Sequence, residues 1–233
     1  MRLAVISDIH ANLEALNRAL EIISKHSIDE IICLGDIVGY GANPNECLEL
    51  VRTKTEFILL GNHDQAAIDI ARAEDFNPYA RASAEWTSQQ LTDENKEFIQ
   101  KLPYTLERHG VFFVHASPYM PHEWNYIITM ADARDNFDHF STPICFVGHS
   151  HTPEIFCEDI WTKEIVRDKK FIVNVGSVGQ PRDADPRLSF GIFDTEKWTY
   201  ENVRSEYDVM TASQKIKKAG LPKMLADRLL IGR

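Results

Sequence analysis

The sequence predicts an α/β protein built from two facing β-sheets with helices on the outside. Short apolar runs typical of strands recur between residues 2 and 149, and helix-like segments separate the first of them. This alternation indicates parallel strands joined by right-handed crossovers. After residue 153 the strand candidates follow one another closely, which is more typical of an antiparallel meander.

The N-terminal part supplies the strand candidates of the parallel type. They are the apolar runs 2–7, 30–35, 56–61, 110–115 and 144–149. Between the first two, the segment 12–26 repeats leucine and isoleucine with the period of a helix, and Asn12 suits its N-cap. We therefore expect a strand, a helix and a second strand at the start of the chain.

The C-terminal part supplies the meander and a final helical segment. The strand candidates are 154–161, 164–168, 170–177, 187–194 and 198–204. Leu221, Leu225 and Leu229 recur every four residues, which predicts an apolar helix face that packs either on the same chain or on a second subunit. We expect one domain over residues 1–233 with a C-terminal helical segment at about 206–233.

Composition excludes several classes of function. With 233 residues and 44% hydrophobic content the chain can form a substantial core, and its net charge of -10 argues against nonspecific binding of nucleic acid. No stretch approaches the roughly 20 apolar residues that cross a bilayer, and the N-terminus enters a strand pattern at once, so we expect a cytoplasmic protein. The four cysteines are widely spaced, which predicts reduced, packed thiols.

Polar side chains follow each of the five N-terminal strand candidates. Because the carboxyl ends of strands line the ligand crevice in open α/β sheets, residues more than a hundred positions apart are expected to converge there. Each motif alone is weak, since a single histidine at a strand end is usually structural. The candidates are Asp8, His10, Asp36, Asn62, His63, Asp64, His115, His149 and His151.

These candidates are too numerous for one metal ion. Two ions about 3.5 to 4 Å apart would use such a set, and this arrangement stabilises in-line displacement at phosphorus. His149 and His151 lie in the stretch GHSHTP, where an extended backbone would turn both imidazoles to one side. A histidine-rich loop without function is the alternative for this stretch alone. With the other motifs present, we expect the two histidines to divide between two metals.

The ordered motifs resemble those of the calcineurin-like metallophosphoesterases, in particular a small bacterial and archaeal branch. The motifs span residues 6–151, and the segments 176–183 and 220–230 are also similar to that branch. The family's DxH, GD, GNHD, H and GHxH motifs correspond to Asp8-Ile9-His10, Gly35-Asp36, Gly61-Asn62-His63-Asp64, His115 and Gly148-His149-Ser150-His151.

The resemblance implies a four-layer α/β/β/α sandwich of two mixed sheets flanked by helices. It also implies a ligand set: Asp8, His10 and His151 for one ion, Asn62, His115 and His149 for the other, and Asp36 as the bridge. In the same way, it implies that His63 contacts the substrate phosphate and protonates the leaving group, while Asp64 orients its imidazole.

The expected activity is hydrolysis of phosphate esters by a metal-bridging hydroxide. The nitrogen and oxygen donors suit Mn²⁺, with Fe, Zn²⁺, Ni²⁺ or Co²⁺ as alternatives. We expect a small phosphorylated substrate, a phosphodiester or nucleotide-type compound, and neither extended nucleic acid nor a membrane as partner; a homo-oligomer is left open. Alternatives are a symmetrical dinucleoside polyphosphate hydrolase, a phosphomonoesterase or, in another class, a non-catalytic metal-binding interaction scaffold.

Two further residues are candidates for binding the substrate. Arg182 could bridge a phosphate through both arms of its guanidinium, or form a salt bridge with Asp183 or Asp185. Tyr40 lies four residues after Asp36 and could wall the site and stack on a base or sugar, or simply pack in its loop. The aromatic stretch 122–126 is interpreted as a capping loop, with a lid as the alternative.

Overall fold

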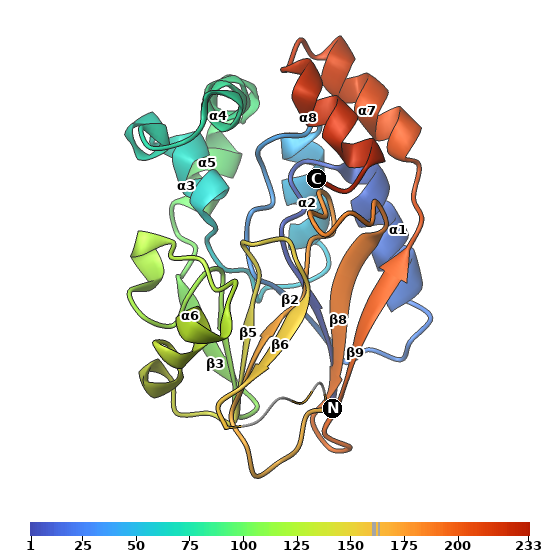
Figure 1. The fold of residues 1–233 in the computed structure, drawn as a ribbon. Helices are drawn as coiled ribbons and strands as arrows, with labels where there is room; N and C mark the ends of the chain where they lie inside the picture. The colour runs from blue at the N-terminus through green and yellow to red at the C-terminus, as the bar shows by residue number, and fades with distance from the viewer. Residues whose placement is uncertain (160–161, 163) are drawn as a thin grey trace.

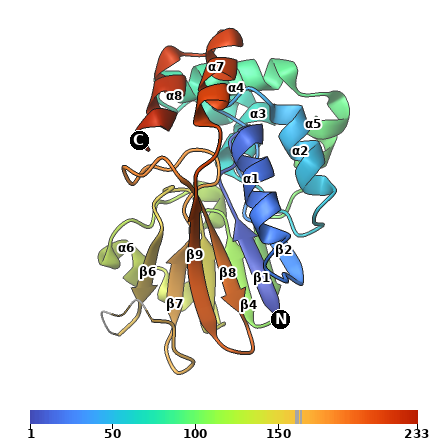
Figure 2. The same ribbon diagram turned by 90° about the vertical axis from the view of Figure 1, so that its right-hand side faces the viewer.

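The computed structural model describes residues 1–159, 162 and 164–233, and it contains two β-sheets (Figures 1 and 2). The first sheet has the strand order β2 (Glu30–Cys33), β1 (Arg2–Ile6), β8 (Leu188–Asp194) and β9 (Thr199–Ser205). The second has the order β3 (Thr105–Arg108), β4 (Val111–Val114), β5 (Ile144–Val147), β7 (Phe171–Asn174) and β6 (Glu154–Cys157).

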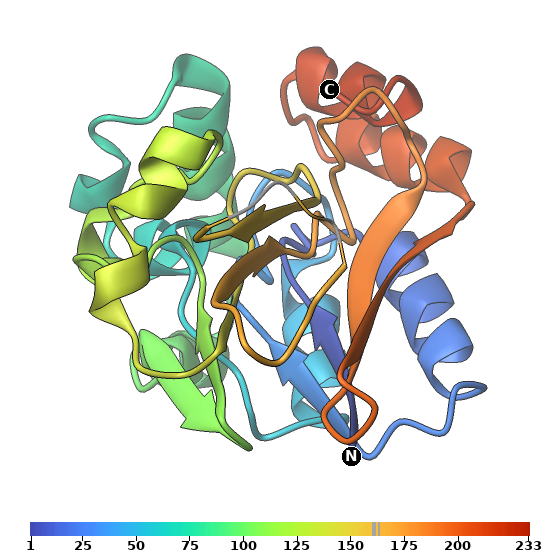
Figure 3. The ribbon, with the colours of Figure 1, turned by 60° about the horizontal axis from the view of Figure 1, so that its bottom comes forward.

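The helices lie outside the sheets and above their strand ends. They are α1 (Leu13–Ile23), α2 (Pro44–Arg52), α3 (Asn62–Ile68), α4 (Pro78–Gln90), α5 (Asp93–Ile99), α6 (Met130–Arg134), α7 (Val209–Lys218) and α8 (Lys223–Asp227). In Figures 1 and 3, the group α3–α5 (teal to green) and the C-terminal helices (red) stand on opposite sides of the strand ends.

Alternation along each strand produces the layers. Leu3 and Val5 of β1 are buried between the two sheets in a cluster that includes Phe146 of β5. Their neighbours Ala4 and Ile6 point the other way and pack against residues of α1 and α2. The outer face of the second sheet is covered by a separate cluster from the segment around α6. The predicted architecture of two mixed sheets flanked by helices is therefore confirmed.

Parallel pairing brings the functional loops to one end of the molecule. Strand β1 pairs in parallel with β2, and β5 pairs in parallel with β4 and β7. The loops after these strands all leave at the end away from the N-terminus, which is at the bottom of Figure 1. As predicted, Asn12 caps α1 by accepting a hydrogen bond from the Ala15 N–H at 3.1 Å.

Three sequence predictions differ from the structure. The run 56–61 makes only an isolated bridge, Ile58 to Cys33, before the chain turns into α3. The meander is wrong, because β6–β7 is a hairpin of the second sheet and β8–β9 a hairpin of the first. Residues 164–168 form no strand, and Ile160 and Trp161 lie outside the described residues. Hairpins look alike in sequence whichever sheet they join, because their local pattern does not encode the distant partner strand.

The C-terminal helices pack on the same chain. Leu221, Leu225 and Leu229 are buried in one cluster with Tyr40 and Ile216 of α7, which settles the alternative that the sequence left open. All four cysteines are buried and unbridged, as predicted. Within the described part of the chain, no helix combines the length and apolar character needed to span a membrane.

Candidate metal centre

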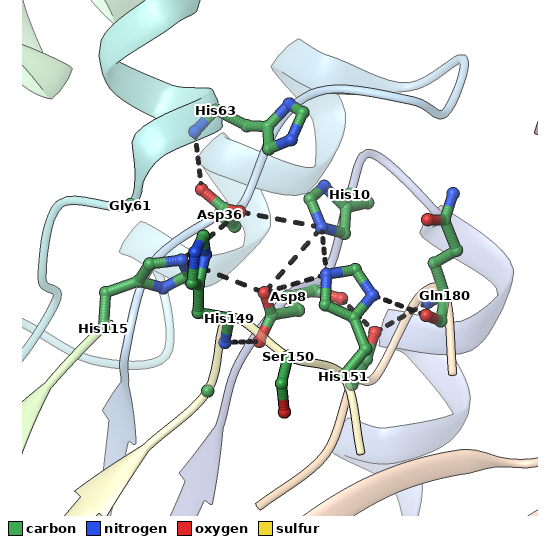
Figure 4. Close-up of polar contacts among 12 residues, drawn as sticks. Asp8, His10, Asp36, Gly61, His63, His115, His149, Ser150, His151 and Gln180 are labelled. Atoms are coloured by element: carbon green, nitrogen blue, oxygen red, sulfur yellow. Dashed lines mark hydrogen bonds and ion pairs between the residues drawn. The ribbon is translucent and has the colours of Figure 1, made fainter. Parts of the chain in front are cut away.

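The predicted ligands converge at the carboxyl ends of strands from both sheets (Figure 4). Two groups of three have ligand atoms within 4.8 Å of one another, and all six residues are buried. The first group is Asp8, His10 and His151; the second is Asp36, His115 and His149. As predicted, the two histidines of GHSHTP fall in different groups. Figure 4 shows His10 and His151 on one side of the two carboxylates and His115 and His149 on the other.

Each carboxylate has one oxygen held by the backbone and one free. Oδ2 of Asp8 accepts the His149 N–H at 3.0 Å, and Oδ1 of Asp36 accepts the His63 N–H at 2.8 Å. The other oxygens, Oδ1 of Asp8 and Oδ2 of Asp36, are buried and have no hydrogen-bond partner among the described residues. The backbone therefore orients both carboxylates and leaves one oxygen of each for a cation.

Main-chain carbonyls fix the tautomers of three imidazoles. Nδ1 of His10 lies 3.1 Å from the main-chain oxygen of Val38. Nδ1 of His115 lies 3.2 Å from that of Leu34, and Nδ1 of His151 lies 2.6 Å from that of Gln180. Because a carbonyl only accepts hydrogen bonds, Nδ1 must carry the proton, and in a neutral ring Nε2 then presents a lone pair. This is the pattern of histidine ligands whose second nitrogen is anchored outside the metal site.

The converging atoms are mutually repulsive unless a cation lies among them. Nε2 of His10 and Nε2 of His151 are 3.1 Å apart, and Oδ1 of Asp8 is 3.2 Å from Nε2 of His151. Further buried acceptors without partners among the described residues are Asn62 Oδ1, His115 Nε2 and His149 Nε2. A set made up only of oxygen and nitrogen donors fits divalent metal ions.

The electrostatics of the site favour cations. Burial raises the pKa of Asp8, but the imidazoles of His151 and His115 outweigh it and hold the pKa below its usual range. Burial lowers the pKa of His115, yet the Asp36 carboxylate raises it to about 9, so in the metal-free protein Nε2 holds a proton that a bound cation would displace. Burial lowers the pKa of His149 to about 3, which leaves its imidazole neutral and able to bind metal at pH 7. Two carboxylates stay ionised in a buried site and attract positive charge.

The ligand loops adopt unusual backbone conformations. Five ligands have positive φ: 53° at Asp8, 51° at His10, 52° at Asp36, 65° at His149 and 60° at His151. Each such non-glycine residue costs of order 1–3 kcal/mol, and such conformations cluster where function requires them. The expectation that His149 and His151 share an extended backbone is wrong, because β5 has already ended. The left-handed conformations send the two imidazoles to different ligand groups.

His63 lies against the site as predicted, but Asp64 does not orient it. The two oxygens of Asp64 accept the N–H groups of Val38 at 3.0 Å and Gly61 at 3.2 Å, so its carboxylate shapes the loops around the site. Nδ1 of His63 is buried without a partner among the described residues. Burial raises the pKa of Asp64 to about 7 and lowers that of His63 to about 4. The assigned role of Asp64 is therefore corrected to a structural one.

A cleft of about 320 Å³ opens beside the ligands. Its lining includes Asn62, His63 and His149 together with Phe76, Trp124 and Tyr126. Tyr126 stacks on His149 with ring centroids 4.0 Å apart, and Trp124 contacts His115 edge-on at 5.8 Å. The aromatic stretch 122–126 therefore borders the cleft, although the sequence favoured a capping loop. Phe76 was missed, because no motif marks the segment between α3 and α4.

The two predicted substrate residues lie together beside the first ligand group. Tyr40 packs against the rings of His10 at 4.7 Å and His63 at 4.3 Å, and only 5% of it is exposed, so it forms a wall. The Arg182 guanidinium lies 5.6 Å from the Tyr40 ring centroid. The alternative salt bridges of Arg182 are not formed within the described chain, since Asp183 pairs with Arg204 and Asp185 with Arg187.

A sequence model of the Calcineurin-like phosphoesterase superfamily domain matches residues 1–198, which include every ligand of the two groups. The chain belongs to this superfamily. It is 43% identical to an uncharacterised protein of Methanocaldococcus jannaschii, over 99% of this chain and 98% of that protein.

Solved structures agree with the assignment. A metallophosphoesterase from Sphaerobacter thermophilus is 39% identical, covers 100% of this chain and 99% of its own, and superposes with a TM-score of 0.89. A hypothetical protein from Pyrococcus horikoshii, 22% identical, shares the fold with a TM-score of 0.84 over 100% of this chain and 98% of its own. The protein is thus a metal-dependent phosphoesterase whose structure carries two metal-ligand groups.

Proposed function

We propose that the protein is a manganese-dependent hydrolase of small phosphodiesters or nucleotide-type esters. The observation that supports this most directly is the pair of ligand groups at the end of the cleft, with unpaired acceptors from both carboxylates. A cleft of about 320 Å³ lies near the lower end of the range for small-molecule sites. That size favours a small ester over a nucleic-acid strand or a folded phosphoprotein.

The chain's own residues orient the reaction. Two bound divalent ions would supply a nucleophile from water near neutral pH and neutralise charge on the phosphate. Asp8 and Asp36 would hold the ions through the oxygens that the backbone leaves free. His63, in the cleft wall between the rings of Tyr40 and Phe76, contacts the phosphate. Burial lowers its pKa to about 4 in the free protein, and the negative charge of a bound phosphate raises that pKa so that the imidazole can donate a proton toward the leaving oxygen. Tyr126 and Trp124 shield the ligand imidazoles on the far side of the cleft from water.

The direct test compares metal-free and metal-loaded protein. A chelated, desalted sample should be inactive on bis-(p-nitrophenyl) phosphate, and Mn²⁺ should restore turnover. Fe²⁺, Zn²⁺, Ni²⁺ and Co²⁺ added separately would rank the alternatives. Turnover by the chelated sample at the same rate would refute the proposal.

An Asp36→Asn variant separates an enzyme from a metal-binding scaffold. Asparagine keeps an oxygen for the His63 N–H but removes the free carboxylate oxygen. We expect kcat to fall by at least about 10²-fold, as when a principal electrostatic contact is lost, with little change in the circular dichroism spectrum. Asp159→Asn, in a loop outside both ligand groups, is the matched control. Unchanged turnover in Asp36→Asn would favour the scaffold.

Hydrolysis of dinucleoside polyphosphates is the second candidate. It is favoured by Arg182, whose guanidinium lies beside the site without a carboxylate partner in the described chain. One structure that shares the fold, 18% identical with a TM-score of 0.57, carries the description of a putative diadenosine tetraphosphatase. Comparing diadenosine tetraphosphate, cyclic nucleotides, p-nitrophenyl phosphate and bis-(p-nitrophenyl) phosphate on the Mn²⁺-loaded protein would rank these substrates.

A further inference from the structure

We propose that Arg182 and Arg228 form an anion subsite beside the metal centre that binds a second, non-hydrolysed phosphate group of the substrate. This inference deepens the proposed function and rests on it. Arg228 lies in the 3₁₀ turn Arg228–Leu230 that follows α8, beyond the stretch 1–198 that matches the superfamily model. The subsite would therefore combine Arg182 of the matched stretch with Arg228 of the C-terminal segment.

Tyr40 joins the two arginines to the metal site. Its ring lies 5.6 Å from Cζ of Arg182 and 6.0 Å from Cζ of Arg228, which is within range of cation–π contact for both. The same ring contacts His10 and His63. The backbone N–H of Arg182 also donates to the His151 carbonyl at 3.2 Å. The Tyr40 ring thus contacts both guanidinium groups and also His10, a predicted ligand, and His63 in the cleft wall.

Neither arginine is paired with an Asp or Glu side chain in the described chain, although acidic residues are adjacent in sequence. Asp183 and Asp185, which follow Arg182, are paired with Arg204 and Arg187. The residue before Arg228, Asp227, is paired with Lys217 and Lys223. Other cations therefore pair with the acidic side chains next to the two arginines in sequence, and neither arginine has an acidic side chain as its counter-charge in the described chain.

Their remaining hydrogen bonds are few. Nη2 of Arg182 donates to Oε1 of Gln180 at 2.9 Å, and its buried Nε has no partner among the described residues. Nε of Arg228 donates to the main-chain oxygen of Arg233, and no acceptor for its two Nη groups is found in the described chain. The Arg182 guanidinium also interacts with the hydroxyl groups of Tyr40 and Tyr126. The N–H groups of the two arginines that lack an acceptor in the described chain, among them Nε of Arg182, are available for a ligand.

The pair is electrostatically unfavourable as it stands. Both side chains are partly buried, and burial together with the charge of Arg182 lowers the pKa of Arg228 to about 10. Although the net charge of the protein is -10, two partly buried cations lie together here without an acidic side chain of the described chain as partner, and an anion would stabilise them. Guanidinium groups match phosphate oxygens in geometry, so the anion fits a phosphate group.

The first test measures binding without catalysis. Inorganic pyrophosphate is titrated by calorimetry into metal-free, desalted protein, and Arg228→Met should weaken its binding at least tenfold, as expected for loss of a charge-assisted contact. Arg228→Lys, which keeps the charge, should recover part of the affinity. Arg81→Met is the matched control, because Arg81 is exposed and pairs with Glu85 on α4, so it removes one positive charge elsewhere. Melting curves confirm that the variants are folded.

The second test uses the Mn²⁺-loaded enzyme. For Arg228→Met, kcat/KM for diadenosine tetraphosphate relative to bis-(p-nitrophenyl) phosphate should fall at least tenfold, mainly through KM. Equal pyrophosphate affinity in wild type and Arg228→Met, or an unchanged substrate ratio, would overturn the subsite. Failure of the wild type to hydrolyse either substrate, with pyrophosphate binding still dependent on Arg228, would instead refute the proposed function and keep the anion site.

Discussion

The backbone approaches the ligand carboxylates so closely that glycine is required beside each of them. A Cβ at Gly61 would lie 2.1 Å from Oδ1 of Asp36, and a Cβ at Gly148 would lie 2.5 Å from Oδ2 of Asp8. These are the carboxylate oxygens that accept backbone N–H groups. The geometry of the ligands therefore depends on the absence of a side chain at residues that bind no metal themselves.

A Gly61→Ala variant tests this dependence. The added methyl group must displace Asp36, so we expect a loss of about 1–3 kcal/mol in the free energy of unfolding together with weaker binding of Mn²⁺. Gly110→Ala is the control: Gly110 has a φ of +71° but nothing within 4 Å of the added Cβ, so it should lose stability without losing metal. Urea unfolding and metal analysis measure both effects, and full metal content in Gly61→Ala would contradict the prediction.

His63 is predicted to act on the leaving group and not as a metal ligand. Its imidazole belongs to neither ligand group and faces the cleft. A His63→Ala variant should retain both metals and lose more kcat on esters with poor leaving groups than on nitrophenyl esters, because only poor leaving groups require a proton. A series of leaving groups of rising pKa measures the slope. An equal loss along the series would show that His63 only positions the phosphate.

At the scale of elements, a half-buried ion pair connects the edges of the two sheets. Glu30 of β2 accepts two hydrogen bonds from Arg108 of β3, at 2.7 and 2.6 Å, and is 16% exposed. The Arg108 guanidinium also lies over the Phe57 ring at 4.1 Å. The hydrogen bonds from Arg108 lower the pKa of Glu30 to about 2 from its usual 4.5. The pair thus joins two strands that belong to different sheets.

This pair should make stability depend on pH. The folded-state pKa is depressed, so its contribution is fully present above about pH 4.5 and is lost as the pH falls toward 2. Glu30→Gln should lower the free energy of unfolding by about 1–2 kcal/mol at pH 7, and the difference from wild type should shrink below pH 4.5. Glu21→Gln is the control, because Glu21 has a similarly low pKa but is exposed to solvent and screened. A constant difference between pH 7 and pH 3 would contradict the assignment.

For the whole molecule, the metal centre is also a cross-link between the two sheets. In the first ligand group, Asp8 and His10 follow a strand of the first sheet and His151 a strand of the second. The second group combines Asp36 from the first sheet with His115 and His149 from the second. A bound cation in either group therefore ties the two sheets together at their carboxyl ends, in addition to the apolar core between them and the Glu30–Arg108 pair.

Metal removal should accordingly lower global stability. An ion at 100 times its Kd adds about 2.7 kcal/mol to the free energy of unfolding when it binds only the folded chain. We expect Mn²⁺ to raise the urea midpoint of the chelated protein, and Asp36→Asn to lose most of that increment. A midpoint that does not respond to saturating Mn²⁺ would show that the sheets are held by the core alone.

The sequence by itself determined the ligands and the fold class. Every predicted metal ligand except Asn62 falls in one of the two groups, and the buried Asn62 oxygen is left unpaired beside them. This succeeded because each ligand follows a short apolar run, and the end of such a run can be read locally. The N-terminal strands, apart from the run 56–61, succeeded for the same reason.

Only the tertiary structure decided the features that depend on distant segments. The hairpin β8–β9 joins the first sheet through β1, and a strand carries no local mark of its partner. The correction of Asp64 depended on where the Val38 and Gly61 N–H groups lie. Arg228 was not among the predicted site residues, and its place beside Tyr40 arises because the buried leucines of the C-terminal segment dock that segment there. The local sequence identifies which residues can bind metal. The groups that orient these residues, and the charged side chains near them, are brought there by packing between residues far apart in sequence.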